Sequence, residues 1–369
     1  MPPLGIYVHV PFCAARCGYC DFNTYVGRST AGFAGAIAAE LRLANDRLGA
    51  RPAATVFFGG GTPTLLAPAE LAAMLDAVRD TVGLRPGAEV TVEANPETVD
   101  RATFRELRAA GVTRISLGMQ SAAPHVLATL DRRHTPGRAV AAAREAHEAG
   151  FEHVSLDLIY GTAGESDDDW RHSLDAALAA GTDHVSAYAL SVQPGTRLAA
   201  QVRRRALPPP DDDVQARRYE MADAALSAAG LTWYELSNWA AADASRCRHN
   251  LGYWRSHDWW GAGPGAHSHV GGERWSNVLH PDAWARRVVR AEHPAAEREA
   301  LTDGERRTER VMLGIRLAEG LGLEGDQRRA AARLAGDGLL ERAPLERDRA
   351  VLTLAGRLRA DTVTRALLL

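Results

Sequence analysis

Three closely spaced cysteines are the residues of this chain whose types and spacing point most directly to chemistry. Cys13, Cys17 and Cys20 form the pattern C-x3-C-x2-C, and Cys247 is the only other cysteine among 369 residues. Four cysteines in a chain of this length do not make a disulfide framework, and a cluster of thiols in a reducing compartment more often binds metal. The spacing therefore predicts a metal site on a single loop.

Two kinds of metal site suit three neighbouring thiolates. A structural zinc site takes four ligands, so zinc would need a fourth from a distant residue such as a histidine. A [4Fe–4S] cluster normally has one cysteine for each iron, so three cysteines leave one iron open to a small molecule. S-adenosylmethionine, which chelates through its amino and carboxylate groups, uses such an open iron for radical chemistry. We therefore favour an open-iron cluster and keep zinc as the alternative.

The composition excludes several other classes of protein. Apolar residues make up 46% of the chain and the net charge is −3 with both signs interspersed, so nothing indicates a nucleic acid or an anionic membrane as partner. All 43 basic residues are arginine, which excludes Schiff-base, pyridoxal-phosphate and Walker A chemistry because each requires a lysine. No stretch approaches the roughly 20 apolar residues of a membrane-spanning helix, so we expect a soluble, cytoplasmic protein.

The elements that must position the cysteines are short β-rich runs, which alternate with helical patterns over the first 236 residues. Each run is rich in β-branched residues and bounded by Gly, Pro or Asn, and most helical stretches end in glycine. Strand followed by helix, repeated six times, predicts an α/β fold with an open, partial (β/α)6 barrel. The predicted strands span residues 6–10, 55–58, 89–94, 114–119, 153–160 and 184–190.

The ligands of such a parallel sheet bind at the carboxyl ends of its strands. The cysteines follow the first predicted strand and the glycine-rich sequence "GGGTPT" follows the second. Glu93 ends the third strand, Gln120 follows the fourth, and Asp157 lies within the fifth. We therefore expect these residues to converge on one rim of the barrel.

The second half of the chain changes in character after a break at "RRRALPPPDDD", residues 203–213, which predicts a solvated loop. We expect the barrel to occupy residues 1–236 and a segment rich in Trp, His and Gly to occupy residues 237–295. Residues 296–369 have a helical pattern with a short strand pair, which predicts a smaller winged-helix-like domain. Its charge is nearly balanced, which favours a structural role over DNA binding.

Several segments together resemble a known family. The cysteine pattern, with Tyr19 just before the last cysteine, and the glycine-rich loop are similar to those of the radical-SAM superfamily. Across nearly the whole chain the closest resemblance is to the oxygen-independent coproporphyrinogen III oxidase-like group. The segments that carry it are "YVHVPFC", "FFGGGTPT", "VEANPE", "ISLGMQS", "LDLIYG", "YELSN" and "CRHNLGYW".

This resemblance implies a set of ligands for the cluster and for S-adenosylmethionine. Acidic side chains of the set can accept hydrogen bonds from an ammonium or from ribose hydroxyls, its arginine can pair with a carboxylate, and Tyr19 can pack on adenine. One departure, Ala163 where relatives have proline, loosens a turn but removes no ligand. By resemblance the cluster is held by Cys13, Cys17 and Cys20, and S-adenosylmethionine by Tyr7, Tyr19, Gly60, Gly61, Thr62, Glu93, Gln120, Arg132 and Asp157.

The group has two branches, and this chain resembles the heme-chaperone branch. The coproporphyrinogen dehydrogenase branch carries C-x3-C-x2-C-x-C after a substantial N-terminal extension, whereas here Phe22 takes the fourth position and twelve residues precede Cys13. We therefore expect a protein that binds a [4Fe–4S] cluster, S-adenosylmethionine and heme, and passes heme to respiratory enzymes or other acceptors. The alternatives are a radical oxidative decarboxylase of coproporphyrinogen III and a zinc-dependent binding module.

The motif H-N-x-x-Y-W of the heme-chaperone branch is intact as His249, Asn250, Tyr253 and Trp254. Imidazole is a common axial ligand of heme iron, and the aromatic pair offers a flat apolar wall, so the resemblance implies heme binding at His249, Tyr253 and Trp254. The alternative from spacing alone is an aromatic rim that closes the barrel mouth, with His249 hydrogen-bonded and not ligating. Further candidate heme ligands are His257, His267, His269 and Cys247.

Overall fold

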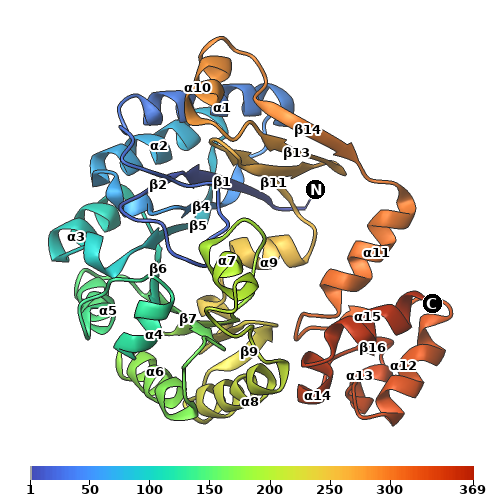
Figure 1. Ribbon diagram of the computed structural model, residues 1–369. Helices are drawn as coiled ribbons and strands as arrows, with labels where there is room; N and C mark the ends of the chain where they lie inside the picture. The colour runs from blue at the N-terminus through green and yellow to red at the C-terminus, as the bar shows by residue number, and fades with distance from the viewer. Residues whose placement is uncertain (1) are drawn as a thin grey trace.

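Residues 2–369 are described in a computed structural model of the chain and are built around one twelve-stranded sheet (Figure 1). The strands of this sheet are β1 (Leu4–Val10), β4 (Ala53–Gly60), β5 (Leu84–Ala94), β6 (Arg114–Gln120), β7 (His153–Tyr160), β8 (His184–Ala189), β9 (Thr232–Glu235), β10 (Asn238–Ala240), β11 (Asp258–Ala262), β12 (His267–Val270), β13 (Glu273–Asn277) and β14 (Ala295–Ala300). Their order across the sheet is β14-β13-β12-β11-β1-β4-β5-β6-β7-β8-β10-β9.

The six predicted strands form the middle of the sheet. They are β1, β4, β5, β6, β7 and β8, and each runs parallel to its neighbour. The helices that connect them cover the outer face, as Figure 1 shows, so the predicted open α/β barrel is confirmed. These helices are α1 (Phe33–Leu48), α2 (Pro68–Thr81), α3 (Arg101–Ala110), α5 (Arg138–Glu148), α6 (Asp167–Ala179) and, after β8, α8 (Asp212–Ala228).

The first strand shows why these segments fold as barrel strands. Successive side chains of a strand point to opposite faces, and on β1 the alternate residues Leu4, Ile6 and Val8 are fully buried in the main core. Tyr7 and His9 point the other way, into the barrel, where the Tyr7 hydroxyl lies 3.1 Å from His9 Nδ1. Apolar residues therefore bind the strand to its covering helices, and polar residues line the interior.

The sheet continues beyond the predicted strands at both edges. β11 pairs in parallel with β1, and β12, β13 and β14 follow as antiparallel strands. At the other edge β10 pairs antiparallel with β8 and then with β9. The sequence analysis predicted no strands between residues 191 and 295, because these strands are short and carry Gly, His and charged side chains. The limits expected between the barrel, the Trp-, His- and Gly-rich segment and the C-terminal domain, at residues 236–237 and 295–296, both fall within this sheet. The first lies between β9 and β10, and the second lies in β14.

A buried carboxylate fastens the β11–β13 extension to the barrel. Glu40 on α1 is fully buried and accepts hydrogen bonds from the Gly263 amide at 2.8 Å, Asn277 Nδ2 at 2.7 Å and Trp284 Nε1 at 2.7 Å. Burial raises the pKa of Glu40 to about 7, and the three hydrogen bonds partly offset this shift. One acidic side chain thus joins three segments more than 220 residues away in the sequence.

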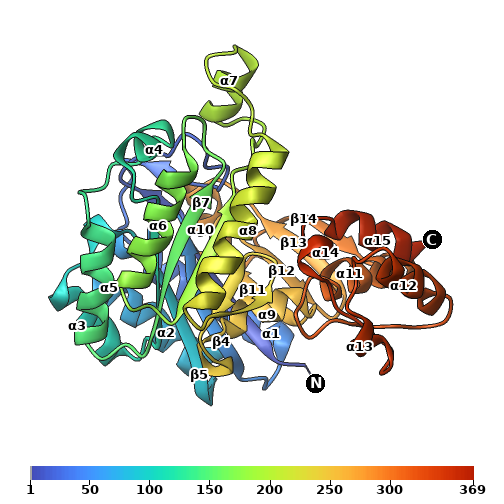
Figure 2. The same cartoon turned by 90° about the horizontal axis from the view of Figure 1, so that it is seen from below.

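The C-terminal region is helical and has its own apolar core, which includes Val311, Leu334 and Val363. A short antiparallel strand pair completes it, as expected for a winged-helix-like unit, and Figure 2 shows these helices beside the barrel. Arg357 attaches the unit to α8 through two contacts with Asp223, at 2.7 and 2.8 Å. The elements are α11 (Asp303–Gly314), β15 (Leu321–Gly322), α12 (Gln327–Gly336), α13 (Arg342–Leu345), β16 (Arg349–Ala350), α14 (Leu354–Arg357) and α15 (Ala360–Leu368).

Short elements connect these layers. Within residues 2–369, the structure has no helix that combines the length and the apolar character needed to cross a lipid bilayer. The short strands and helices are β2 (Phe12–Cys13), β3 (Tyr25–Val26), α4 (Pro124–Thr129), α7 (Arg197–Arg203), α9 (Arg248–Trp254), α10 (Pro281–Val289) and the 3-10 turns Pro63–Leu65, Pro96–Thr98 and Asp243–Ser245.

Replacing Glu40 with alanine tests the role of this carboxylate in joining the extension to α1. The change leaves three buried donors without an acceptor, so we expect the free energy of unfolding to fall by about 3 kcal/mol or more. Urea denaturation measures this change, with Asp46→Ala on the exposed side of the same helix as the matched control, expected within about 0.5 kcal/mol of the unchanged protein. Equal stability of the two variants would contradict the assignment.

Candidate functional site

The cysteine loop lies where β1 ends. After Val10 the chain forms β2, which ends at Cys13 and pairs with β3, and the loop between these two strands carries Cys17 and Cys20. The loop is fastened to the barrel by a hydrogen bond from the Gly18 amide to the Leu130 carbonyl at 3.2 Å. The free thiols of Cys13, Cys17 and Cys20 are partly exposed, so the loop presents three sulfur ligands at the carboxyl ends of the strands.

Polar side chains from neighbouring segments contact two of the thiols of the loop. Arg132 Nη1 donates to Cys17 Sγ at 3.4 Å, and the Thr62 hydroxyl lies 4.0 Å from Cys13 Sγ. Burial raises the pKa of Cys13 and of Cys20, and the other thiols of the loop contribute in the same direction. Without metal these groups are therefore neutral thiols, and coordination to iron would be needed to make them thiolates.

The donor set fits a cluster better than a single ion. Among residues 2–369, no three His, Cys, Asp or Glu side chains converge closely enough to hold one metal ion. A single tetrahedral ion draws all its ligands toward one centre. In a [4Fe–4S] cluster each thiolate binds a different iron, so the sulfur atoms lie farther apart. Three separate thiols on one loop are therefore a suitable donor set for a cluster with one open iron.

The glycine-rich loop after β4 packs directly on the start of the cysteine loop. The Gly61 amide donates to the Val10 carbonyl at 2.7 Å, and the Thr62 amide donates to the Phe12 carbonyl at 2.8 Å. A Cβ on Gly61 would lie 2.5 Å from the Phe12 carbonyl oxygen, and Gly60 has a φ of 105°, a conformation that favours glycine. Glycine is thus required here, because the two loops approach through their backbones.

Two partly buried carboxylates, Glu93 and Asp157, lie inside the barrel beside this loop. Burial, and then the charge of Asp157, raise the pKa of Glu93 to about 8. Burial also raises the pKa of Asp157, which accepts from the Ser116 hydroxyl at 3.0 Å. Glu93 accepts from the Gly60 amide at 3.1 Å and has no cationic partner among the described residues. A ligand that brings an ammonium group would supply the missing positive charge.

Strand β6 and the segment that follows α4 contribute a strained glutamine and a partly buried arginine. Gln120, the last residue of β6, has a φ of 66°, which is uncommon for a residue with a side chain and typical of functional sites. Arg132 Nη2 donates to the Gly118 carbonyl at 3.2 Å, whereas its Nε is buried without a hydrogen-bond partner in residues 2–369. A guanidinium with one buried and unused donor, next to a thiol, is a suitable partner for a carboxylate.

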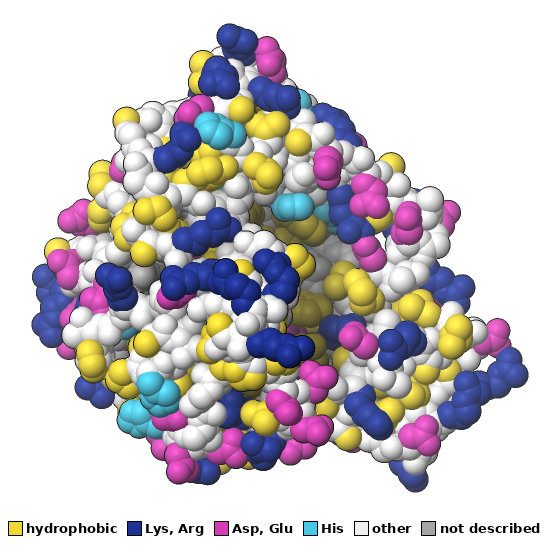
Figure 3. Space-filling model, in the orientation of Figure 1, with side chains coloured by type: hydrophobic (Ala, Val, Ile, Leu, Met, Phe, Trp, Pro, Cys, Tyr) yellow, Lys and Arg dark blue, Asp and Glu magenta, His cyan; other side chains and the backbone are white. Residues whose placement is uncertain are grey.

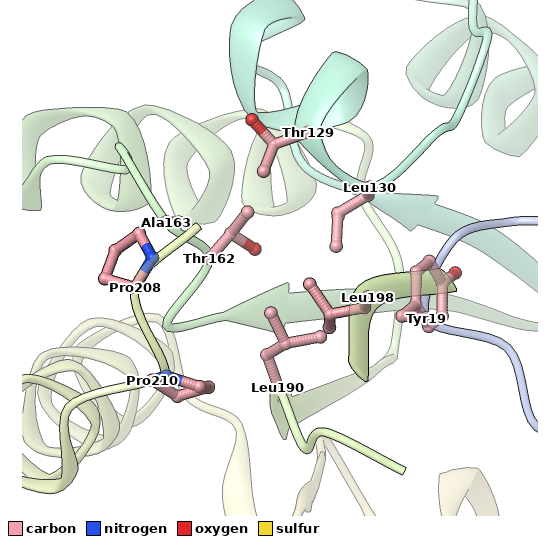
Figure 4. Close-up of a pocket in the computed structure, with 9 residues that line it drawn as sticks. All are labelled: Tyr19, Thr129, Leu130, Thr162, Ala163, Leu190, Leu198, Pro208 and Pro210. Atoms are coloured by element: carbon pink, nitrogen blue, oxygen red, sulfur yellow. The ribbon is translucent and has the colours of Figure 1, made fainter. Parts of the chain in front are cut away.

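Tyr19 lies in a different environment from the other predicted ligands. Its ring packs against an apolar cluster that includes Leu130 and Leu198, and Figure 4 shows it at the edge of a small cavity. This cavity has a volume of about 10 Å³, which is room for one water molecule and not for an adenine ring. α7 holds this arrangement closed, because the Leu198 amide donates to the Gly18 carbonyl at 2.8 Å. The contact of Tyr19 with adenine stays a prediction.

The residues of the H-N-x-x-Y-W motif lie at the opposite end of the strands from the cysteine loop. They are on α9, where the His249 ring would lie 3.0 Å from a Cβ on Gly5, near the start of β1. In Figure 2, α9 lies toward the end of the barrel where the chain starts, and α7 marks the other end. The structure therefore does not bring the predicted heme residues together with the cysteines.

His249 is an interior, hydrogen-bonded histidine. Its Nδ1 lies 2.8 Å from the Thr55 hydroxyl and its Nε2 lies 2.8 Å from the Tyr253 hydroxyl, and only 3% of the residue is exposed. Burial lowers the pKa of His249 to about 3, so the ring is neutral. This is the hydrogen-bonded arrangement that the sequence analysis gave as its alternative, and heme ligation by His249 stays a prediction.

The sequence analysis missed the side chain that holds α9 in place. Glu89, near the middle of β5, accepts from the amides of Arg248 and His249 at 3.0 and 2.9 Å, and it lies 3.5 Å from Arg114. Cys247 Sγ also donates to Glu89 Oε1 at 3.7 Å, so this fourth cysteine belongs to the amino ends of the strands. The signal that could have found it is the acidic side chain at the start of the predicted strand 89–94, on the same face as Glu93.

Comparison with known proteins identifies the family. Residues 7–177 match the radical SAM superfamily. A protein of Mycobacterium tuberculosis (strain ATCC 25618 / H37Rv) named heme chaperone HemW is 56% identical to this chain, and the match covers 99% of the chain and 95% of the relative. The chain belongs to the HemW family.

Other relatives of the HemW family and its fold agree with this identification. The heme chaperone HemW of Escherichia coli (strain K12) is 36% identical, with 80% of this chain and 75% of the relative covered. A solved structure of E. coli coproporphyrinogen III oxidase (HemN), described as a radical SAM enzyme, shares the fold with a TM-score of 0.82. The sequence of that enzyme is 23% identical to this chain, and the match covers 99% of this chain and 90% of the enzyme. The family supports the cluster and S-adenosylmethionine over the zinc alternative.

Two cysteine variants test which thiols hold iron. Cys17→Ala removes a sulfur of the loop, so we expect the protein to lose most of its iron and its visible absorbance after anaerobic reconstitution. Cys247→Ala is the matched control and should retain both, because Cys247 contacts Glu89 at the other end of the strands. Loss of iron in the control, or spectroscopy that finds four cysteine ligands, would contradict the open-iron cluster.

The raised pKa of Glu93 predicts how stability depends on pH in the protein without S-adenosylmethionine. Because the folded-state pKa of about 8 lies above the ordinary value of 4.5, the fold is progressively destabilised as pH rises between these values. Glu93→Gln removes this loss, so its melting temperature should exceed that of the unchanged protein by about 2 °C or more at pH near 9, and by less at pH near 5. Thermal unfolding measures the difference, with exposed Glu106→Gln on α3 as control. A difference independent of pH would show that Glu93 is already ionised.

Proposed function

We propose that this chain is a heme chaperone: it binds a [4Fe–4S] cluster, S-adenosylmethionine and heme, and it delivers heme to acceptor proteins. The observation that carries the proposal is the 56% identity, over nearly the full length of both chains, with a protein named heme chaperone HemW. The relative from E. coli with the same name supports it at 36% identity. Respiratory enzymes are the acceptors that we propose, with the cytoplasm as the place of transfer.

At the carboxyl ends of the strands, we propose that the cysteines bind the cluster and that nearby charged residues bind S-adenosylmethionine. Cys13, Cys17 and Cys20 supply thiolates to three irons and leave the fourth open. A cluster with bound S-adenosylmethionine supplies one-electron chemistry. Glu93, which lacks a cation, suits the amino group of S-adenosylmethionine, and Arg132, whose Nε lacks an acceptor, suits its carboxylate.

The remaining residues of the proposed S-adenosylmethionine site line the same end of the barrel. Asp157 is held by serine hydroxyls and suits a ribose hydroxyl as donor. The Gly60–Thr62 backbone forms a tight wall against the cysteine loop, and Gln120 ends the adjacent strand in a strained conformation. Tyr7 lies beside Glu93. Burial, and then the charge of Glu93, hold the pKa of the Tyr7 hydroxyl well above its usual range, so this group remains a neutral hydrogen-bond donor.

The alternative activity, oxidative decarboxylation of coproporphyrinogen III, has less support. The shared fold with E. coli HemN at 23% identity is a likeness of architecture alone. At the position of the fourth clustered cysteine in the dehydrogenase branch this chain has Phe22, a side chain that cannot ligate metal and is 56% exposed.

A paired assay on the reconstituted protein separates the two functions. We expect the protein to bind heme with a distinct Soret band and to make no protoporphyrinogen from coproporphyrinogen III under anaerobic, reducing conditions. The E. coli coproporphyrinogen III oxidase serves as the positive control for turnover. Loaded protein should then transfer its heme to a heme-free respiratory enzyme faster than free heme enters it. Turnover of coproporphyrinogen, or the absence of heme binding, would overturn the proposal.

A further inference from the structure

A groove of about 530 Å³ lies between the barrel and the C-terminal helices. Figure 3 shows this face of the molecule hollowed between the two parts. Its volume is within the range of about 300–1,000 Å³ that is typical of small-molecule sites, whereas the other two cavities described here have about 10 and 20 Å³. We call it the lateral groove, and residues that line it include Trp254, His269, Leu301, Arg306, Arg310 and Leu321.

The lateral groove and the buried motif histidine are joined by a row of touching aromatic rings. The His249 ring contacts Tyr253 with centroids 4.9 Å apart, Tyr253 contacts Trp259 at 4.8 Å, and Trp259 contacts His269 at 5.2 Å. Trp254, the last residue of the motif, itself lines the groove. The motif residues thus form the wall behind the groove, and His249 supports this wall from inside the barrel.

His269 is the histidine of this row that faces the groove. The backbone of His257 lies beside the His269 ring, and no hydrogen bond from residues 2–369 occupies its ring nitrogens in the way that Thr55 and Tyr253 occupy both nitrogens of His249. A metal-binding histidine usually donates one ring N–H to a carbonyl, because the bond fixes the tautomer and the orientation of the ring, and the His257 backbone is the group placed beside His269 for this role. His269 is 8% exposed, so its position is set by its surroundings.

The opposite wall of the groove is positively charged where α11 lines it. Arg306 and Arg310 are four residues apart and therefore lie on the same side of the helix. Their partners Asp303 and Glu324 are highly exposed, with 100% and 69% of their side chains accessible, so these ion pairs are weak.

The carboxylates that line the groove are occupied elsewhere. Glu309 pairs with Arg274, Asp258 pairs with Arg51, and Glu319 accepts from Arg255 at 2.6 and 3.0 Å. The two arginines of α11 are therefore the groove side chains that can exchange a weak partner for an anionic ligand.

We propose that the lateral groove is the heme-binding site, with His269 as an axial ligand, Trp254 against the porphyrin face, and Arg306 and Arg310 at the propionates. This inference rests on the proposed function, because it names the place where the chaperone holds its cargo. Heme combines the features that the groove offers: a metal that binds imidazole, a flat apolar ring, and two carboxylates. His249 is then a positioning residue behind the site.

Heme titration of histidine variants tests the axial ligand. His269→Ala should weaken heme binding by about tenfold or more and shift the Soret band, and added imidazole should restore the band. His267→Ala is the matched control, because His267 lies on the same strand, is exposed and does not line the groove. It should keep both affinity and spectrum. His249→Ala should weaken binding without rescue by imidazole, because it loses a support and not a ligand.

Unchanged heme binding by His269→Ala, with a clear effect only at His249, would overturn the inference and leave the proposed function intact. No heme binding by the unaltered protein would instead overturn the proposed function itself.

The propionate contacts give a second test that does not disturb the core. An Arg306→Glu, Arg310→Glu double variant should bind heme about tenfold more weakly, yet bind heme dimethyl ester, which lacks the carboxylates, as the unaltered protein does. The exposed pair Arg328→Glu, Arg329→Glu on α12 is the control and should change neither affinity. Equal loss of heme and of its ester, or no loss of either, would contradict placement of the propionates at α11.

Discussion

The Glu89 carboxylate is the interaction on which one end of this barrel depends. It is 5% exposed within β5, and it accepts the amides of Arg248 and His249 while it lies beside Arg114. The first amides of a helix have no partner within the helix, and its positive end favours an anion. A single buried charge therefore supplies the acceptors that α9 needs and fixes where its aromatic side chains lie.

This anchoring keeps the residues of the H-N-x-x-Y-W motif apart from the cysteines and the predicted S-adenosylmethionine ligands. The carboxyl ends of the strands carry thiols, a glycine-rich loop and carboxyl groups without a cationic partner among the described residues, all suited to a polar cofactor. The amino ends carry packed rings, among them His249, whose two ring nitrogens are both hydrogen-bonded. The same parallel strands thus offer an open polar surface at one end and a closed aromatic one at the other.

The sequence predicted the parts of this architecture that are encoded locally. The six barrel strands are β-branched runs between turn residues, and the glycine loop is where a Cβ would collide with the Phe12 backbone. The strands β11–β14 escaped prediction because their pairing depends on remote contacts, such as the hydrogen bond of Glu40 with Asn277. The place of His249 escaped for the same reason, since Glu89 lies 160 residues earlier in the chain. No local pattern reports such distances.

The closure of the barrel by α9 also determines from which sides a cofactor and a partner protein can reach this chain. The packed rings of His249, Tyr253 and Trp259 lie between the cysteine loop and the lateral groove, so the two sites are reached from different sides of the protein. A partner protein that covered the groove would leave the cofactor entrance open. The aromatic row from Tyr7 and Phe57 to His269 is a continuous path of contacts from the barrel interior to that partner. The place where cofactors enter and the place where a partner protein would dock are thus separate surfaces of one chain.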